Sequence, residues 1–267
     1  MTFQAIIIAD SVSPVGKRLI TLQLVFPRFI LPEFNTHRVF SRNASSSRAI
    51  PVKKMIELIK SNPASPAEWG KNQPGMQAGE ELSGEDLKLT KDLWAKAASS
   101  AIQIAEEMNQ YGAHKQIINR ILEPFQWANV IVTSTEWDNF FELRNHKDAQ
   151  PEIRILASRM LDAMNNSIPK NLDYGNWHLP FINSSERIEY SEEHLLKMST
   201  ARCARVSYLT HEGKAPSLED DLKLYERLVG SKPIHASPTE HQAKPNVDKN
   251  ISSGNFKGWI QYRKTIK

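Results

Sequence analysis

Two apolar runs near the start of the chain predict a β-hairpin. Phe3–Ile8 and Leu19–Phe26 are rich in β-branched residues, and Asp10–Lys17 between them carries Ser, Pro and Gly residues that favour turns. Phe34–Pro51 is polar, rich in Arg and Ser and without a clean period, which predicts a loop or a short helix that presents its side chains. Ser61–Gly79 is dense in Pro, Gly and Asn and predicts a long loop.

Four later stretches have apolar residues at helical spacing. The first follows Ser83 and ends at Gly112, and Asp86, three residues after Ser83, resembles the second half of a capping box. The other three are expected at about Lys115–Leu122, directly after Pro151, and between the capping residue Ser217 and Gly230. No repeat of solenoid length occurs. The pattern predicts an α+β fold, with a mixed or antiparallel sheet packed against long helices.

Composition narrows the class of protein. The 267 residues suffice for one large domain or two small ones, and 40% hydrophobic residues can fill a core, so we expect a single domain over 1–267. No apolar run approaches the roughly 20 residues that cross a bilayer, and Met1–Asp10 lacks the features of a signal peptide, which favours a cytoplasmic protein without membrane contact. The single cysteine, Cys203, excludes an intrachain disulfide and a thiolate metal site. The net charge of +4 fits an anionic ligand but does not indicate nucleic acid by itself.

Hydrogen-bond donors concentrate in one short stretch: His37, Arg38, Ser41, Asn43, Ser45, Ser46, Ser47 and Arg48. Arginine meets phosphate oxygens with a planar fork, and hydroxyls and backbone N–H groups complete such a cradle. On composition alone, a phosphate site and a solvated surface loop are equally good interpretations.

A second stretch, from Asn139 to Arg154, places Arg144 beside two aromatic residues and a leucine. A guanidinium next to apolar surface needs a partner, because water is scarce there. Without further information the favoured interpretation is an internal ion pair, for instance with Glu142 or Glu152.

Together these stretches resemble the flavin-dependent thymidylate synthase family, whose motifs can be written RHRxxSxNxxSxR and NFLxLRxxxxAQxEIR. Here residues 36–48 read THRVFSRNASSSR, residues 139–144 read NFFELR and residues 149–154 read AQPEIR. Two long motifs matching in order are a specific signal. Between them, GAHKQIINRILEP at 112–124 resembles the family's helix that ends in an Arg four residues before a Pro, and this similarity puts Arg120 at a nucleotide-binding position.

The order of the family's segments differs in this chain. Segments like the family's AARVSY and HxSPFEH normally precede the first motif, but ARVSY stands here at 204–208 and HASPTEH at 235–241. We interpret this as a circular permutation, which is plausible where the ends of a domain lie close together. The resemblance covers most of the chain and is weakest over about 62–109.

The chain also departs from the family's residues. The first Arg of the motif is Thr36, the acidic residue after Asn is Ala44, and the Gly before the last Arg is Ser47. The Asn and Arg upstream of the second motif fall near Thr133 and Thr135. Because GWIQYRK near the end of the chain is similar to the family's QWxRHR, we hypothesise that Arg263 supplies the cation missing at Thr36.

The resemblance implies reductive methylation of dUMP at C5 to dTMP, with FAD as cofactor and methylenetetrahydrofolate and NADPH as co-substrates. It also implies a homo-oligomer, a tetramer, with sites where subunits meet. Arg144 would stabilise negative charge on the pyrimidine ring. The expected nucleotide-binding residues are Ser46, Ser47, Arg48, Arg120 and Arg144. The expected FAD-binding residues are His37, Arg38, Asn139, Ser237 and Arg263.

Three alternatives stay open: methylation or hydroxymethylation of another pyrimidine nucleotide, a flavin-binding homologue without turnover, and a non-enzymatic nucleic-acid-binding module. The last predicts steep salt dependence and no flavin.

Other candidate residues favour ordinary structural roles. We expect Cys203 to be a packing residue rather than a nucleophile, and His235 and His241 to be structural or flavin-side residues rather than metal ligands. Ser207, Glu240 and His241 lack the nucleophile elbow of a hydrolase triad. Trp127 and Trp137 are expected in the core rather than as stacking platforms.

Overall fold

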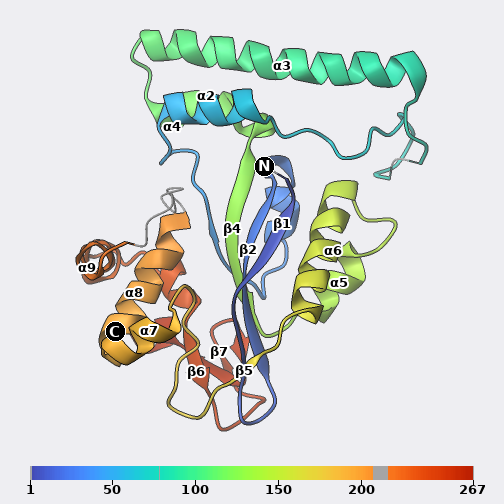
Figure 1. Cartoon of the computed structure of the whole chain (residues 1–267). Helices are drawn as coiled ribbons and strands as arrows, with labels where there is room; N and C mark the ends of the chain where they lie inside the picture. Colours follow the sequence, from blue (N-terminus) through green and yellow to red (C-terminus); the bar gives the residue numbers. More distant parts are fainter. Residues whose placement is uncertain (1, 78, 207–215, 267) are drawn as a thin grey trace.

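A five-stranded sheet forms the centre of the protein (Figure 1). The computed structural model describes residues 2–77, 79–206 and 216–266. In the order β3-β4-β2-β1-β5, neighbouring strands are antiparallel except β1 and β5, which are parallel. The strands are β1 (Gln4–Val12), β2 (Arg18–Pro27), β3 (Ser41–Ala44), β4 (Trp127–Ser134) and β5 (Lys170–Asn171). The predicted α+β class with a mixed sheet is confirmed.

The first two strands form the predicted hairpin. β1 and β2 pair from Gln4 with Val25 to Val12 with Arg18, and the turn between them closes with a 2.9 Å bond from the N–H of Ser13 to the carbonyl of Lys17. Gly16 has a φ of +76°, a conformation that glycine adopts without a steric penalty. The turn residues seen in the sequence therefore act as predicted.

The two faces of β2 serve different parts of the molecule. Ile20, Leu22, Leu24 and Phe26 alternate along the strand and pack in the main core with α5 (Asp138–Arg144) and α6 (Pro151–Asn165). Leu19 and Thr21, on the opposite face, are buried against the C-terminal part of the chain. Both faces of the strand are thus covered, which explains its nearly continuous apolar sequence. Trp137 is buried in the main core, as predicted, whereas Trp127 is only partly buried.

A separate helical layer lies at one end of the sheet, where α3 runs along α2 and α4 and contacts both (Figure 1). These helices, α2 (Val52–Ser61), α3 (Gly84–Gln110) and α4 (Lys115–Ile121), share a second apolar cluster. α3 and α4 confirm two predicted helices, and α6 confirms a third. The capping box at Ser83 is wrong: the Ser83 side chain makes no capping hydrogen bond, and Gly84, the first residue of α3, has a φ of +57°.

An ion network joins three helices of the C-terminal part, α7 (Ser184–Glu189), α8 (Glu192–Arg205) and α9 (Leu218–Tyr225). Arg202 donates from Nε to Asp221 at 2.8 Å and pairs with Glu186 at 2.7 Å, and Arg205 pairs with the same Asp221 at 2.9 Å. Asp221 is fully buried, so removing either guanidinium would leave a poorly compensated charge. Ser217 accepts a bond from the N–H of Asp220, which confirms the predicted cap, and the fourth predicted helix continues past α9 as a π-helical turn, Glu226–Gly230.

The remaining elements are short. They are α1 (Leu31–Asn35), β6 (Ala243–Pro245), β7 (Ser252–Ser253), β8 (Phe256–Lys257), β9 (Trp259–Gln261) and the 3-10 turns η1 (Arg28–Ile30), η2 (Glu123–Phe125), η5 (Ser237–Glu240) and η6 (Tyr262–Lys264). The two ends of the chain lie well apart, the N-terminus near the helical layer and the C-terminus near α7 (Figure 1). Among the described residues, no helix has the length and apolar character to cross a membrane.

A buried chain of hydrogen bonds ties the C-terminal part to the sheet. Thr21 and Thr133 lie 2.7 Å apart on adjacent strands; His178 contacts Thr21 at 2.9 Å, and His241 contacts Thr133 at 2.8 Å. Both histidines are fully buried, and this burial lowers the pKa of each to about 3. They are therefore neutral near pH 7, and His241 has the structural role predicted as one of its two options.

These two histidines predict an acid-sensitive fold. Each pKa is lowered from 6.5 to about 3. Between these two pH values, the unfolded chain therefore binds protons that the folded chain does not. The contribution of these histidines to the free energy of unfolding should be complete above pH 6.5. Below that pH, the free energy of unfolding should fall by about 1.4 kcal/mol per pH unit for each histidine. Urea unfolding between about pH 7 and pH 5 measures this slope.

The matched comparison is His241→Gln against His146→Gln, because His146 is exposed. The first substitution should flatten the pH slope and the second should leave it unchanged. An unaltered slope in His241→Gln would contradict the assignment.

Candidate functional site

The Arg- and Ser-rich motif forms an edge strand and the turn after it, not the predicted loop or short helix alone. β3 pairs with β4 in antiparallel register, from Ser41 opposite Thr133 to Ala44 opposite Val130. Successive side chains of a strand point to opposite faces. Burial accordingly alternates: Ser41, Asn43, Ser45 and Ser47 are buried, whereas Arg42, Ala44, Ser46 and Arg48 are partly buried or exposed.

The buried members of the motif have partners inside the protein. Ser41 accepts a bond from Gln261 at 3.2 Å, and Asn43 donates to the carbonyl of Cys203 at 3.4 Å. Ser45 accepts from the N–H of Asn129 at 3.1 Å. These groups hold the strand in place, so only the other half of the motif faces outward for a ligand.

Just before β3, Arg144 and His37 meet. Arg144 donates from Nε to Nε2 of His37 at 3.0 Å and from Nη2 to the hydroxyl of Thr36 at 3.4 Å. Glu152 is buried elsewhere and accepts from the N–H of Ala67 at 2.7 Å. Among the described residues Arg144 makes no ion pair, so the internal ion pair with Glu142 or Glu152 is wrong.

The surroundings keep His37 neutral. Its ring packs edge-on against Phe140 with centroids 4.9 Å apart and stacks near Phe40 at 5.8 Å. Burial first, and then the charges of Arg144 and Arg42, lower the pKa of His37. Because Nε2 accepts from Arg144, the proton of the neutral ring sits on Nδ1, which remains a donor.

Two predicted flavin-side residues lie exposed near this pair in sequence. Arg38 follows His37 directly, and Asn139 begins the first turn of α5, the helix that carries Arg144. Neither side chain has a hydrogen bond within the described ranges. Both therefore have donors available for a ligand.

A second cluster gathers beyond the other end of β3, around a residue that sequence reasoning missed. Glu123 accepts from Ser47 at 2.6 Å, pairs with Arg120 at 2.9 Å and pairs with Arg28 at 3.2 Å. The spacing of three between Arg120 and Glu123 was the available signal for the first of these ion pairs. Ser47 and Arg120, both predicted to bind nucleotide, are thus joined through one carboxylate. Arg48 is exposed and makes no hydrogen bond with described residues.

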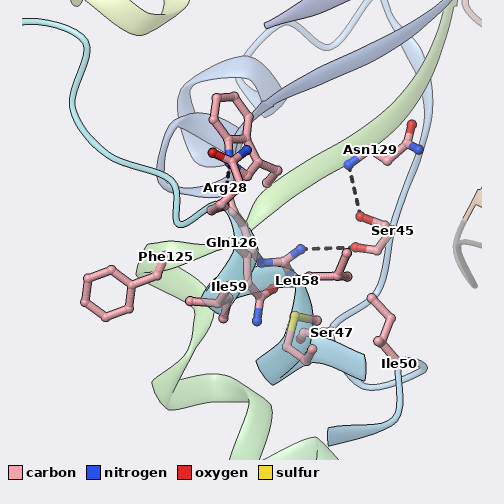
Figure 2. Close-up of a pocket in the computed structure, with 12 residues that line it drawn as sticks. Arg28, Ser45, Ser47, Ile50, Leu58, Ile59, Phe125, Gln126 and Asn129 are labelled. Carbon is pink, nitrogen blue, oxygen red and sulfur yellow. Dashed lines mark hydrogen bonds between the residues drawn. The ribbon is translucent and has the colours of Figure 1, made fainter. Parts of the chain in front are cut away.

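A small pocket lies beside this cluster (Figure 2). Its lining includes Arg28, Ser45, Ser47, Gln126 and Asn129, and Arg28 reaches across to the carbonyl of Ser45 at 3.1 Å. The cavity measures about 30 Å³, which is room for roughly two water molecules and not for a nucleotide.

The C-terminal segment with the HASPTEH sequence packs against the same strand. η5 lies beside β3, and Gln261 bridges Ser41 and the carbonyl of Glu240 at 3.2 Å each. Ser237 is exposed on η5, whereas Glu240 is half-buried, and burial raises its pKa against the opposing effect of Arg263. The permutation stays a hypothesis, and the separation of the two chain ends does not favour it (Figure 1). Ser207 and Tyr208 lie outside the described residues.

The predicted residues therefore fall into separate groups within one chain. His37 and Arg144 lie before β3, and Ser47 and Arg120 lie beyond its other end; Arg48 belongs to neither set of contacts. Cys203 is fully buried, and burial raises the pKa of its thiol. In the described part of the chain no three His, Cys, Asp or Glu side chains gather as metal ligands.

Comparison with known proteins identifies the family of this chain. The family model described as thymidylate synthase complementing protein matches residues 5–170, which include both motifs. No curated protein sequence matches this chain.

Among solved structures, the chain is similar to a UMP/dUMP methylase, PolB, from Streptomyces cacaoi. In complex with 5-Br dUMP the identity is 18%, the TM-score is 0.46, and the match covers 55% of this chain and 66% of that one. For the same protein in complex with 5-Br UMP, the identity is 15%, the TM-score is 0.49, and the match covers 61% of this chain and 88% of that one. For Thymidylate Synthase X from Helicobacter pylori with FAD and dUMP, the identity is 13% and the TM-score is 0.40. That match covers 55% of this chain and 67% of the other. Because the family model spans more than half of the chain and contains both motif segments, this protein belongs to the thymidylate synthase complementing protein family, the enzymes of the flavin-dependent thymidylate synthase type.

Proposed function

We propose that this enzyme is a flavin-dependent thymidylate synthase, which methylates dUMP at C5 with methylenetetrahydrofolate as the carbon donor and NADPH as the reductant. The observation that carries the proposal is the bond from Arg144 to His37, which joins the two family motifs across 107 residues. Residues predicted to hold the pyrimidine and the flavin thereby meet at one place on the surface.

The residues at that place fit an anionic, flat cofactor. Arg38 and Asn139 have unused donors, Arg144 has Nη1 free of partners within the described chain, and Phe140 with Phe40 makes an apolar wall behind His37. FAD, when bound, supplies the hydride chemistry. We assign His37, Arg38, Asn139 and Ser237 to FAD binding.

Each of these side chains has a separate task. Arg144 keeps its charge at any physiological pH, so it can stabilise negative charge that builds on the pyrimidine ring. The bonds to His37 and Thr36 fix the direction of its guanidinium in advance. His37, neutral with its proton on Nδ1, orients Arg144 without adding a competing charge.

The nucleotide phosphate is assigned to Ser46, Arg48 and Arg120, with Ser47 as their support. Ser46 and Arg48 are on the outward side of the motif, and Ser47 and Arg120 are joined through Glu123. This group lies beyond the opposite end of β3 from Arg144, so within one chain the residues assigned to the phosphate and to the pyrimidine belong to separate groups of contacts. In a homo-oligomer, the phosphate residues of one copy can lie beside Arg144 of another copy. The form that the family implies is a tetramer.

A flavin and its reduction test the proposal directly. Purified enzyme should be yellow, NADPH should bleach the colour, and addition of dUMP with methylenetetrahydrofolate should yield dTMP. Absorbance and product analysis follow these steps, with dCMP and the ribose counterparts as alternative substrates. Product from dCMP or UMP in place of dUMP would favour the related-methylase alternative, and a colourless protein that takes up no FAD would leave the proposal without support.

Replacing Arg144 by Ala should lower kcat by about 100-fold, because a preorganised donor at the developing charge is lost. Arg144→Lys should recover only part of the rate, since it keeps the charge but not the planar fork. Stopped-flow and steady-state turnover per bound flavin give the effect. Arg159→Ala, an exposed arginine of α6, is the matched control; equal turnover in both alanine variants would remove Arg144 from the mechanism.

Cys203→Ser should retain turnover. The thiol is fully buried, and the raised pKa keeps it protonated, so it cannot act as the nucleophile that ordinary thymidylate synthases need. A stability loss of about 1 kcal/mol is expected, because a smaller and more polar hydroxyl would replace a sulfur that packs with Ile131 and Val206 and accepts from Gln242 at 3.6 Å. Turnover per folded, flavin-loaded chain is the measurement, and its complete loss would argue against a flavin mechanism.

A further inference from the structure

Arg42 is a cation on the outward face of β3 that the family's motif does not specify. It lies between the buried residues Ser41 and Asn43 and is itself partly buried. Its guanidinium turns back toward α1: Nη1 donates to the carbonyl of Asn35 at 2.8 Å and to that of His37 at 3.1 Å, with a longer contact to Phe34 at 3.5 Å. Arg42 thus caps the carbonyl end of α1, where a positive charge is favoured.

Only one nitrogen of this guanidinium is used by those bonds. Within the described chain Nη2 and Nε of Arg42 have no hydrogen-bond partner. A guanidinium held by one nitrogen presents the other two as a fork of fixed direction, the geometry that phosphate oxygens accept. Because the folded protein already orders this side chain, ligand binding would lose little further conformational entropy.

Two cations therefore converge on Thr36, the position where the family motif has its first arginine. Arg42 binds the carbonyls on both sides of Thr36, and Arg144 donates to the hydroxyl of Thr36 at 3.4 Å. The charges of Arg144 and Arg42 both act on the neighbouring His37. The positive charge absent from the side chain at 36 is thus present around it.

The nearby carboxylate, Glu240, acts on the charge of Arg42 and is shared with other cations. Glu240 interacts with Arg263, Lys264 and Arg42, so three cations surround one acid. Arg263 also donates to the carbonyl of Ile266 at 3.5 Å. Of these three cations, Arg42 is the one that donates hydrogen bonds to the carbonyls on both sides of Thr36, among the described residues.

We propose that Arg42, and not Arg263, replaces the missing arginine at Thr36 and binds a phosphate group of a ligand, either the pyrophosphate of FAD or the monophosphate of dUMP. This assignment rests on the proposed function, since it presupposes that both ligands bind.

The test compares ligands with and without phosphate: dUMP against deoxyuridine, and FAD against riboflavin, which lacks both the pyrophosphate and the adenosine. Binding of FAD, riboflavin, dUMP and deoxyuridine to the wild-type enzyme, Arg42→Ala, Arg42→Lys and Arg263→Ala is measured by flavin fluorescence and calorimetry. Arg42→Ala should weaken FAD or dUMP by about tenfold or more and leave the partner without phosphate unchanged. The ligand that weakens identifies the source of the phosphate. Circular dichroism and thermal unfolding report whether α1 is intact, and Arg42→Lys provides a milder change should Arg42→Ala unfold.

Reinstating the family's arginine adds a sharper test. Thr36→Arg in the Arg42→Ala background should restore the lost affinity, whereas Thr36→Arg alone should bring no gain, because it crowds a third guanidinium between Arg42 and Arg144. Equal losses for ligands with and without phosphate, no loss at all, or a loss produced by Arg263→Ala instead would overturn the assignment. Failure of the wild-type enzyme to bind FAD and dUMP would instead contradict the proposed function.

Discussion

The pairing of β3 with β4 is the constraint on which the site depends. Paired to β4, the motif becomes a strand, and the twofold alternation of a strand then separates its donors onto two faces. Ser41, Asn43 and Ser45 are fixed by bonds to the C-terminal part and to β4. A slip of one residue in this register would bury Arg42 and Ala44 and expose Ser41 and Asn43.

Fixed charges are arranged around this strand so that each acid faces more than one base. Glu123 serves Arg28, Arg120 and Ser47 beyond one end of the strand, and Glu240 faces three cations near the other. Guanidinium groups held in this way keep both their charge and their direction. Such preorganisation suits a ligand that carries phosphate groups and develops negative charge during reaction.

The C-terminal part completes the strand's environment from a distant position in the sequence. The ion network around Asp221 fixes α8 against α9, and His241 joins the sheet through Thr133. Because His178 and His241 are buried and neutral, these links act by hydrogen bonding and shape and carry no charge. Thr133, which lies near the expected position of a family asparagine, therefore serves the fold in this chain.

The sequence by itself determined the local elements and the family. The hairpin, α3, α4, α6 and α9 follow from apolar spacing, turn residues and proline positions, which act over a few neighbouring residues. The two motifs identified the family because long patterns in order are specific. By contrast, the strand β3 was not predicted, since its alternation is hidden when both of its buried residues, Ser41 and Asn43, are polar.

Only the tertiary structure decided which charges meet. No spacing in the sequence shows that Arg144 contacts His37 across 107 residues or that Arg28 reaches Glu123. The tertiary structure also showed that the internal ion pair expected for Arg144 is absent among the described residues. It brings Arg42 to the carbonyls around Thr36. The physical reason is that an ion pair or a hydrogen bond depends on distance and direction in space, which strand pairing and core packing set for residues that the sequence keeps far apart.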